Sequence, residues 1–219
     1  MIRVVVVDDE ALVRSGFTMI LRAAGDIEVV ATATGTDAVR EIVLARPDVV
    51  LLDIRMPEVD GLTVLEQVLA MSSPPAIAML TTFDTDEYVR RALVTGASGF
   101  LLKDTDPEQL VQSVRALAAG AVVLSPGATR PVLATSNDNG RREAQKLVAT
   151  LTDRERDVLA LVREGMSNAE IGRELFLSAS TVKDHVSAVL GKLGATSRVQ
   201  AALTAQLARL ERRPVPGDS

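Results

Sequence analysis

Residues 48–57 read DVVLLDIRMP, in which four branched apolar residues lead directly to an acid at position 53. A strand that is apolar at every position is typical of a parallel sheet with helices on both faces, because neither row of side chains meets water. Four further apolar runs of similar length occur in the first 120 residues. The predicted strands are residues 3–7, 28–32, 48–52, 76–80 and 99–102.

Segments with a helical spacing of apolar residues separate these strands, at 11–24, 36–45, 62–71, 86–95 and 107–119. This alternation predicts an α/β doubly wound, flavodoxin-like domain with a five-stranded parallel sheet. In such sheets the functional crevice lies outside the carboxyl ends of the strands. The residues that directly follow each strand are therefore the first candidates for a site.

The chain has 219 residues, enough for two small domains; 47% of them are hydrophobic but only 2% are aromatic. So few aromatic side chains argue against a base-stacking platform for single-stranded nucleic acid.

The absence of cysteine excludes disulfides, thiolate metal sites and cysteine nucleophiles, and it suits a reducing cytosol. No apolar run approaches the roughly 20 residues of a membrane span, and the N-terminal run reads as a buried strand rather than a signal peptide. We expect a soluble, cytoplasmic protein with no membrane partner.

The pattern changes after residue 122, where proline, glycine and polar residues replace the apolar periodicity. Pro126, Gly127, Pro131 and the run SNDNG at 136–140 are typical of a linker, and a helix from Arg141 onward stays open. The segments beyond are helical and begin at residues suited to capping: Thr152 with Glu155, Ser167 with Glu170, Ser178, and Ser197. The predicted division is a first domain at 1–122, a linker at 123–149, a helical domain at 150–211 and a disordered tail at 212–219.

The two halves of the chain differ in charge. Residues 1–125 hold 10 basic and 18 acidic side chains, whereas residues 126–219 hold 14 and 11. An acidic half joined to a mildly basic half favours a nucleic-acid function in the second half. The signal is weak, because residues 150–200 carry seven charges of each sign.

Polar and charged residues follow the predicted strands, so the topology brings them to one edge of the sheet. They are Asp8 and Asp9 after the first strand, Asp53 after the third, Thr81 and Thr82 after the fourth, and Phe100 and Lys103 from the fifth. Neighbouring carboxylates repel one another unless a cation joins them, and all-oxygen ligands suit Mg²⁺. A carboxylate can also attack phosphorus, while a metal ion and a lysine stabilise the phosphoryl group in transfer.

These residues stand in the motifs VVVVDDE, LLDIRMPEVDG, LTTFD and GASGFLLKD. In order and spacing the motifs closely resemble the receiver domains of response regulators over residues 1–120. The resemblance implies that Asp53 is the phosphoacceptor. It also implies that Asp8, Asp9 and Asp53 hold Mg²⁺ together with the backbone carbonyl of Arg55.

The same resemblance assigns roles to residues of the last two strands. It implies that Lys103 contacts the phosphoryl group and that Thr81 moves to hydrogen-bond it. Phe100 is implied to be the aromatic residue that turns inward when Thr81 moves. One departure from many receivers is that Asp104, rather than proline, follows Lys103, a form similar to the DNA-binding subgroup described next.

Residues 169–192 read as a helix, a short break at 176–178 and a second helix. Gly172 stands where the two helices are expected to cross, and the absence of a side chain there permits close packing. In a helix-turn-helix the second helix enters the major groove of DNA with its N-terminal residues first. The motifs LTxRExxVL, SNxEI, STVKxHV and KLG resemble in series the four-helix DNA-binding domain of NarL/LuxR-type regulators.

This second resemblance implies that Lys183, Asp184 and Ser187 face the base edges. The candidates for phosphate contacts, which position a protein without specifying sequence, are Ser178, Thr181 and Lys192. Asp184 is a departure, because an acid in the groove repels phosphate, although it can accept a hydrogen bond from cytosine N4. The alternative is that Asp184 is a solvated acid off the groove face.

The last helix carries an apolar stripe whose members are Val199, Leu203, Leu207 and Leu210. Part of this stripe must cover its own domain. The remainder is a candidate dimer contact, as in the family, and Val199, Leu203 and Leu207 are assigned to it. A dimer would read two half-sites about one helical turn, ~10 bp, apart.

The leading hypothesis is a transcriptional response regulator, not an enzyme. A sensor histidine kinase would phosphorylate Asp53 in a Mg²⁺-dependent reaction, and the phosphorylated homodimer would bind double-stranded promoter DNA. The alternative is an orphan regulator that binds DNA whether or not Asp53 is phosphorylated. A third hypothesis, an aspartyl phosphohydrolase, is disfavoured because such enzymes usually need a second acid two residues on, where this chain has Arg55.

Overall fold

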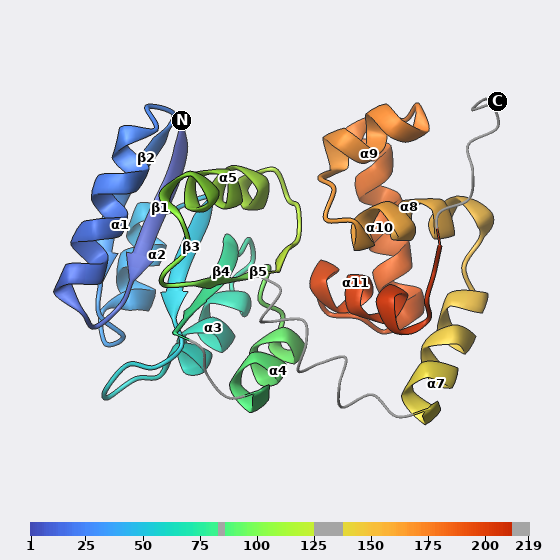
Figure 1. Cartoon of the computed structure of the whole chain (residues 1–219), viewed down its shortest axis with the longest axis horizontal. Coiled ribbons are helices and arrows are strands. Elements are labelled where there is room, and N and C mark those ends of the chain that lie inside the picture. The colour runs from blue at the N-terminus through green and yellow to red at the C-terminus, as the bar shows by residue number, and fades with distance from the viewer. Residues whose placement is uncertain (83–85, 125–137, 212–219) are drawn as a thin grey trace. The chain divides into compact units, whose positions relative to one another are not determined.

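The computed structural model describes residues 1–82, 86–124 and 138–211, and the chain divides into two compact units, Met1–Val132 and Leu133–Ser219 (Figure 1). The predictions for Pro126, Gly127, Pro131 and the tail at 212–219 concern residues outside the described ranges. Among the helices of the described ranges, none combines the length and apolarity that a bilayer crossing requires.

The first unit alternates strands and helices as predicted. Its elements are β1 (Ile2–Val7), α1 (Ala11–Ala23), β2 (Ile27–Ala33), α2 (Ala38–Ala45), β3 (Val49–Asp53), α3 (Gly61–Leu69), β4 (Ala76–Thr81), α4 (Asp86–Thr95), β5 (Gly99–Leu102), α5 (Pro107–Ala118) and β6 (Val123–Leu124). All the strand pairs are parallel, and the strand order is β2-β1-β3-β4-β5-β6. The doubly wound fold is confirmed.

The prediction of five strands is wrong by one, because β6 adds a sixth at the edge of the sheet. It pairs with β5 through Gly99 and Val123 and has only two residues, too few to show a periodic pattern. Gly99 leaves room for this neighbour, since a Cβ there would lie 2.7 Å from the Val123 carbonyl oxygen. The predicted boundary at 122/123 therefore cuts just before the last strand.

Burial of both faces explains why the central strands β1 and β3 are almost entirely apolar. Val4, Val6 and Leu51 pack on one face in a core cluster with residues of α1 and α5. The alternating residues Val5 and Leu52 are equally buried and point to the other face, where α2 contacts β1 and α3 contacts β3. The sheet is thus rigidly covered on both sides, and only its edges and strand ends are open for a site.

The second unit is helical: α7 (Asp138–Ala149), α8 (Asp153–Arg163), α9 (Asn168–Leu175), α10 (Ala179–Leu193) and α11 (Arg198–Leu207). The two predicted capping boxes, Thr152 with Glu155 and Ser167 with Glu170, are both present. The side chains of Ser178 and Ser197 accept hydrogen bonds from backbone N–H groups at the starts of α10 and α11. The sequence signals for the helix starts are confirmed.

Helix α7 belongs to the second unit and not to a linker. Val148, at its C-terminal end, lies in a core cluster with Leu159 of α8, Leu193 of α10 and Ala205 of α11. The prediction of a linker over 123–149 is corrected, because the buried side of α7 completes the core of the helical unit. The segment that joins the described parts of the two units is 125–137.

Candidate functional site

The carboxylates predicted at the strand ends do come together. Register pairs Val7 of β1 with Leu52 of β3, so the acids that follow these residues leave the sheet at the same level. Oxygen atoms of Asp8, Asp9 and Asp53 all lie within 4.8 Å of one another. Asp8 is fully buried and Asp53 is 4% exposed, whereas Asp9 is exposed. The cluster is therefore open to solvent on one side only.

Lys103 closes the buried side of this cluster. Its ammonium nitrogen lies 2.9 Å from Asp8 Oδ2, 3.1 Å from Asp53 Oδ2 and 3.2 Å from Glu10 Oε1. The backbone N–H of Lys103 donates to the carbonyl oxygen of Thr81, which ties the end of β5 to the end of β4. Sequence reasoning did not single out Glu10, although its place directly after two acids was a signal. One cation thus meets three carboxylates.

Burial sets the ionisation of this pair. Desolvation and the charge of Asp8 raise the pKa of Asp53 to about 6, against hydrogen bonds from Lys103 and the Arg55 backbone N–H. Burial alone would lower the pKa of Lys103, but its hydrogen bonds to Asp8 and Asp53 hold that pKa above its usual range. At neutral pH the site therefore contains an ionised carboxylate beside a fixed ammonium group, the arrangement that a phosphoryl acceptor needs.

The acidic cluster fits a small, hard cation. Asp8 Oδ2 is covered by protein, and the Lys103 ammonium lies 2.9 Å from it. Asp8 Oδ1 accepts a hydrogen bond of 2.9 Å from the backbone N–H of Glu10, which fixes the carboxylate. Carboxylate oxygens from Asp8, Asp9 and Asp53 are the donor set that Mg²⁺ takes. Coordination of Mg²⁺ by the backbone carbonyl of Arg55 stays a prediction.

The two predicted switch residues lie on the neighbouring strands β4 and β5. Thr81 ends β4 and is buried, and Phe100 of β5 is fully buried and paired with Met79. The neighbouring Thr82 is exposed. Movement of Thr81 and Phe100 stays a prediction.

Arg55, two residues after Asp53, stacks on Tyr88 of α4, with its guanidinium carbon 5.3 Å from the ring centroid.

Glycines hold the loop after Asp53 in place, a feature that sequence reasoning missed. The N–H of Gly61 donates to the carbonyl oxygen of Ile54 at 2.9 Å, and a Cβ on Gly61 would lie 2.0 Å from the Asp53 carbonyl oxygen. Asp60 caps α3 by accepting from the N–H of Thr63 at 2.8 Å. The loop therefore returns tightly to the end of β3 and fixes the backbone that carries Asp53.

Helices α9 and α10 form the predicted helix-turn-helix. A Cβ on Gly172 would lie 2.6 Å from the carbonyl oxygen of Leu177, and the N–H of Leu177 donates to the Gly172 carbonyl at 2.8 Å. Ile171 and Val182 are fully buried and join the two helices in one core cluster. The prediction that Gly172 permits close approach is confirmed, and the close contact is with the turn.

The residues predicted to face DNA are exposed along α10. Lys183, Asp184 and Ser187 are all exposed, and Ser187 Oγ donates to the Lys183 carbonyl one turn earlier. Ser178 is exposed at the N-cap, and its Oγ accepts from the N–H of the half-buried Thr181 at 3.1 Å. The exposed face of α10 is thus available to a groove, and its base and phosphate contacts stay predictions.

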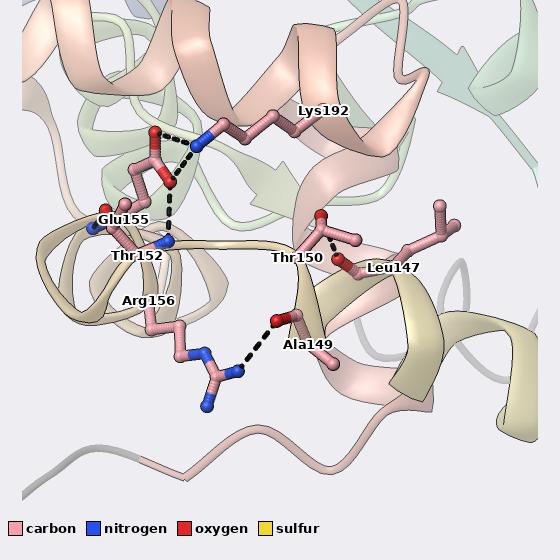
Figure 2. A network of polar contacts seen from close by, with 7 residues as sticks. All are labelled: Leu147, Ala149, Thr150, Thr152, Glu155, Arg156 and Lys192. Carbon is pink, nitrogen blue, oxygen red and sulfur yellow. Dashed lines mark hydrogen bonds and ion pairs between the residues drawn. The ribbon is translucent and has the colours of Figure 1, made fainter.

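Two other expectations change. Lys192 is held within its own domain, since its ammonium lies 2.8 and 2.7 Å from the two carboxylate oxygens of Glu155 (Figure 2). In α11, Val199 is fully buried and Leu203 is 8% exposed, so the domain's own core already covers both. Their assignment to a dimer contact is therefore wrong. Leu207 is half-buried and remains a candidate for that contact.

Comparison with known protein families matches both units. Residues 4–115 match the response regulator receiver domain, and residues 149–205 match the bacterial regulatory proteins of the luxR family. The chain is 38% identical to the nitrate/nitrite response regulator protein NarL of Escherichia coli (strain K12) over 201 residues, 91% of this chain and 93% of NarL. It is 36% identical to the DNA-binding transcriptional activator DevR/DosR of Mycobacterium tuberculosis over 219 residues, 100% of this chain and 99% of that protein.

Solved structures give the same result. The response regulator ChrA of a heme-sensing two-component system is similar with a TM-score of 0.53 and 33% identity, over 95% of this chain and 98% of ChrA. A structure of two RcsB dimers bound to two parallel DNAs has a TM-score of 0.56 at 21% identity, over 94% and 98% of the chains, and shows a likeness of fold alone. The chain belongs to the luxR-type response regulators, the DNA-binding transcriptional regulators of two-component systems.

Proposed function

We propose that Asp53 accepts a phosphoryl group from a sensor histidine kinase and that this modification controls dimerisation and promoter binding in the cytoplasm. The observation that carries the proposal is the placement of Asp53, nearly buried, between two further acids and the Lys103 ammonium at 3.1 Å. Burial of a carboxylate beside other acids costs folding free energy, and such strained groups are common at functional sites. In phosphoryl transfer to Asp53 the neighbouring acids would hold the metal ion and the lysine would stabilise the phosphoryl group.

The transfer forms one bond and breaks one. An oxygen of Asp53 attacks the phosphorus of a phosphohistidine, the P–N bond breaks, and its electron pair stays on the imidazole, which takes up a proton. Lys103 then compensates charge on the transferred group from the position in which it now contacts Asp53 and Glu10. Mg²⁺, held by Asp8, Asp9, Asp53 and the carbonyl of Arg55, would neutralise phosphoryl oxygens when bound.

The phosphorylated acid has a direct route to the output surface. Thr81 ends the strand next to Asp53, and its carbonyl oxygen is bonded to the backbone of Lys103. A phosphoryl group on Asp53 offers acceptors to the Thr81 hydroxyl, whose movement changes the space beside Phe100. We propose that this exchange selects between two receiver states, one of which pairs with a second copy.

The DNA contacts follow from the exposed face of α10. Lys183 and Ser187 lie one helical turn apart and face the bases with Asp184 between them, while Ser178 and Thr181 at the helix start contact phosphate. A homodimer, joined through the receivers and at Leu207, reads two half-sites in double-stranded promoter DNA.

The test is selection of genomic DNA fragments by the full chain with acetyl phosphate and Mg²⁺. The wild type should enrich a short, roughly dyad-symmetric motif, and Asp53→Ala should lose it. Glu66→Gln, which changes an exposed acid on α3, is the matched control and should behave as the wild type does. Equal enrichment by wild type and Asp53→Ala would instead favour the orphan regulator.

A further inference from the structure

Glu155 and Lys192 form a contact that the proposed function does not explain. Glu155 is the third residue of α8, and its side chain is only 8% exposed. One of its oxygens accepts from the backbone N–H of Thr152 at 2.7 Å, and both accept from the Lys192 ammonium at 2.8 and 2.7 Å (Figure 2). A largely buried carboxylate requires such compensation, and Lys192, whose own side chain is 39% exposed, supplies it in the protein without DNA.

The pair joins two helix ends. Lys192 lies in the last turn of α10, and its neighbour Leu193 is buried in the core cluster that also contains Val148 of α7. Nine residues separate Lys192 from Lys183, or about 13 Å along the helix axis at 1.5 Å per residue. Since the N-terminal residues of the second helix enter the groove first, the ion pair holds the end of α10 far from the bases.

The ion pair is part of a longer polar connection. Arg156, next to Glu155, donates to the carbonyl oxygen of Ala149 at the end of α7, and Thr150 donates to the carbonyl of Leu147 (Figure 2). The C-terminal end of α10 is therefore tied to the corner between α7 and α8. The turn at Gly172 and Leu177 fixes its other end, so the two attachments together determine the direction in which α10 points.

We propose that Lys192 is a positioning residue, which with Glu155 sets the orientation of the DNA-reading helix α10, and not a phosphate contact. This inference rests on the proposed DNA-binding role of α10. It replaces the role that the family resemblance implied for Lys192. A lysine held by a largely buried carboxylate would have to give up both of its contacts with Glu155 to reach a phosphate, and only the Thr152 N–H, which carries no charge, would then remain of the hydrogen bonds described here.

The two roles differ in their dependence on salt. A lysine that neutralises one phosphate contributes about one unit to the slope of log affinity against log salt, for every DNA sequence. A residue that only orients the reading helix affects contacts to bases, so its loss lowers specific affinity and leaves non-specific affinity and the slope unchanged.

The experiment measures affinity of the full phosphorylated chain for its enriched fragment and for an unrelated fragment of equal length, at several salt concentrations. The variants are Lys192→Gln, Glu155→Gln, the double variant, and Lys192→Arg, which keeps the ion pair. Lys183→Gln is the matched control on the same helix, since no carboxylate of the described residues pairs with Lys183. Thermal unfolding of each variant establishes the temperature at which all are folded.

Both single variants should lose about tenfold or more in specific affinity, with non-specific affinity and salt slope unchanged. The double variant should be no weaker than the weaker single variant, and Lys192→Arg should restore binding. Lys183→Gln removes an exposed positive charge from the groove face of α10, so it should weaken binding to both fragments, and more strongly to the enriched one, where a base contact is lost as well. The double variant leaves no charge without a partner, so it keeps the test decisive if a single variant unfolds.

The proposal is overturned if Lys192→Gln weakens binding to both fragments and reduces the salt slope by about one unit while Glu155→Gln binds normally. It is also overturned if neither substitution changes specific affinity. Failure of the wild type to prefer any fragment would count against the proposed function, and the salt slope of Lys192→Gln on unrelated DNA would still decide whether Lys192 contacts phosphate.

Discussion

Lys103 and Asp53 form an ion pair of 3.1 Å in which both side chains are largely buried, at 11% and 5% exposed. The same ammonium also contacts Asp8, so Asp53 competes with a second buried acid for a single cation. Burial of the carboxylate, together with the negative charge of Asp8, explains why Asp53 has a raised pKa in spite of a lysine in direct contact. The properties of the acceptor should therefore respond to changes at Lys103.

Lys103→Met should raise the pKa of Asp53 beyond about 6, because the substitution removes a hydrogen bond and a positive charge that favour the ionised carboxylate. Carboxyl-carbon NMR titration of aspartate-labelled protein without divalent metal measures this pKa. Lys146→Met, at an exposed pair with Glu143 in the second unit, is the control and should leave it unchanged. A lower Asp53 pKa in Lys103→Met would contradict the electrostatic account.

Asp53→Asn should stabilise the metal-free receiver at pH 8. The pKa of Asp53 is about 6 in the folded chain and near 3.8 in the unfolded one, so the loss of folded-state stability from its ionisation develops between these values and is complete above about pH 6. The stability gain of the variant should be on the order of 2 kcal/mol at pH 8 and should fade as the pH falls through 6 towards 4. Urea unfolding of both proteins over this range is the measurement, and a gain that does not vary with pH would contradict the prediction.

Mg²⁺ should stabilise the wild type more than Asp53→Asn or Asp9→Asn, because each substitution removes an anionic oxygen from the cluster. At ten times its dissociation constant, an ion that binds only the folded state adds about 1.4 kcal/mol. Thermal unfolding with and without millimolar Mg²⁺ measures the effect. Glu66→Gln should respond as the wild type does, and equal stabilisation of all four proteins would argue against the cluster as the site.

Gly61→Ala should destabilise the receiver by about 1–3 kcal/mol, because its Cβ would lie 2.0 Å from the Asp53 carbonyl oxygen. Gly16→Ala in α1 is the matched control, since nothing lies within 4 Å of its added Cβ. That control should instead be stabilised by about 0.5–1 kcal/mol through helix propensity. Denaturant unfolding compares the two, and equal effects would show that steric contact at the Asp53 loop is unimportant.

Asp184→Asn should raise affinity for all DNA fragments by about threefold or more, because an exposed acid on the reading helix repels phosphate. Glu164→Gln, an exposed acid at the end of α8, serves as the control. If affinity falls instead, and only for particular sequences, Asp184 acts as an acceptor for a base such as cytosine.

Most of the fold was predictable because strong local signals agree with it. The largely apolar runs marked β1 to β5. Thr152 and Ser167 marked helix starts, because capping geometry needs no distant partner. What sequence reasoning missed depends on distant contacts. The strand β6 exists only by pairing with Gly99, and α7 is fixed by a core formed with α8, α10 and α11.

The candidate sites likewise contain features that the sequence predicts and features that depend on distant contacts. The position of Asp8, Asp9, Asp53 and Lys103 at one edge followed from topology, and the structure confirms their proximity. The pairing of Lys192 with Glu155 did not follow, because 37 residues separate the two and neither spacing nor composition relates them. Val199 was misassigned for a similar reason, since an apolar stripe does not reveal which of its members the domain itself covers.

The place of α7 in the helical core has a consequence for promoter geometry. Leu124 and Asp138 are 14 positions apart, so a fully extended chain between them reaches at most about 50 Å. In the proposed dimer, a connection of at most this length would keep the two DNA-binding domains at a high effective concentration near each other. Adjacent half-sites about 34 Å apart would fall within the reach of such a dimer.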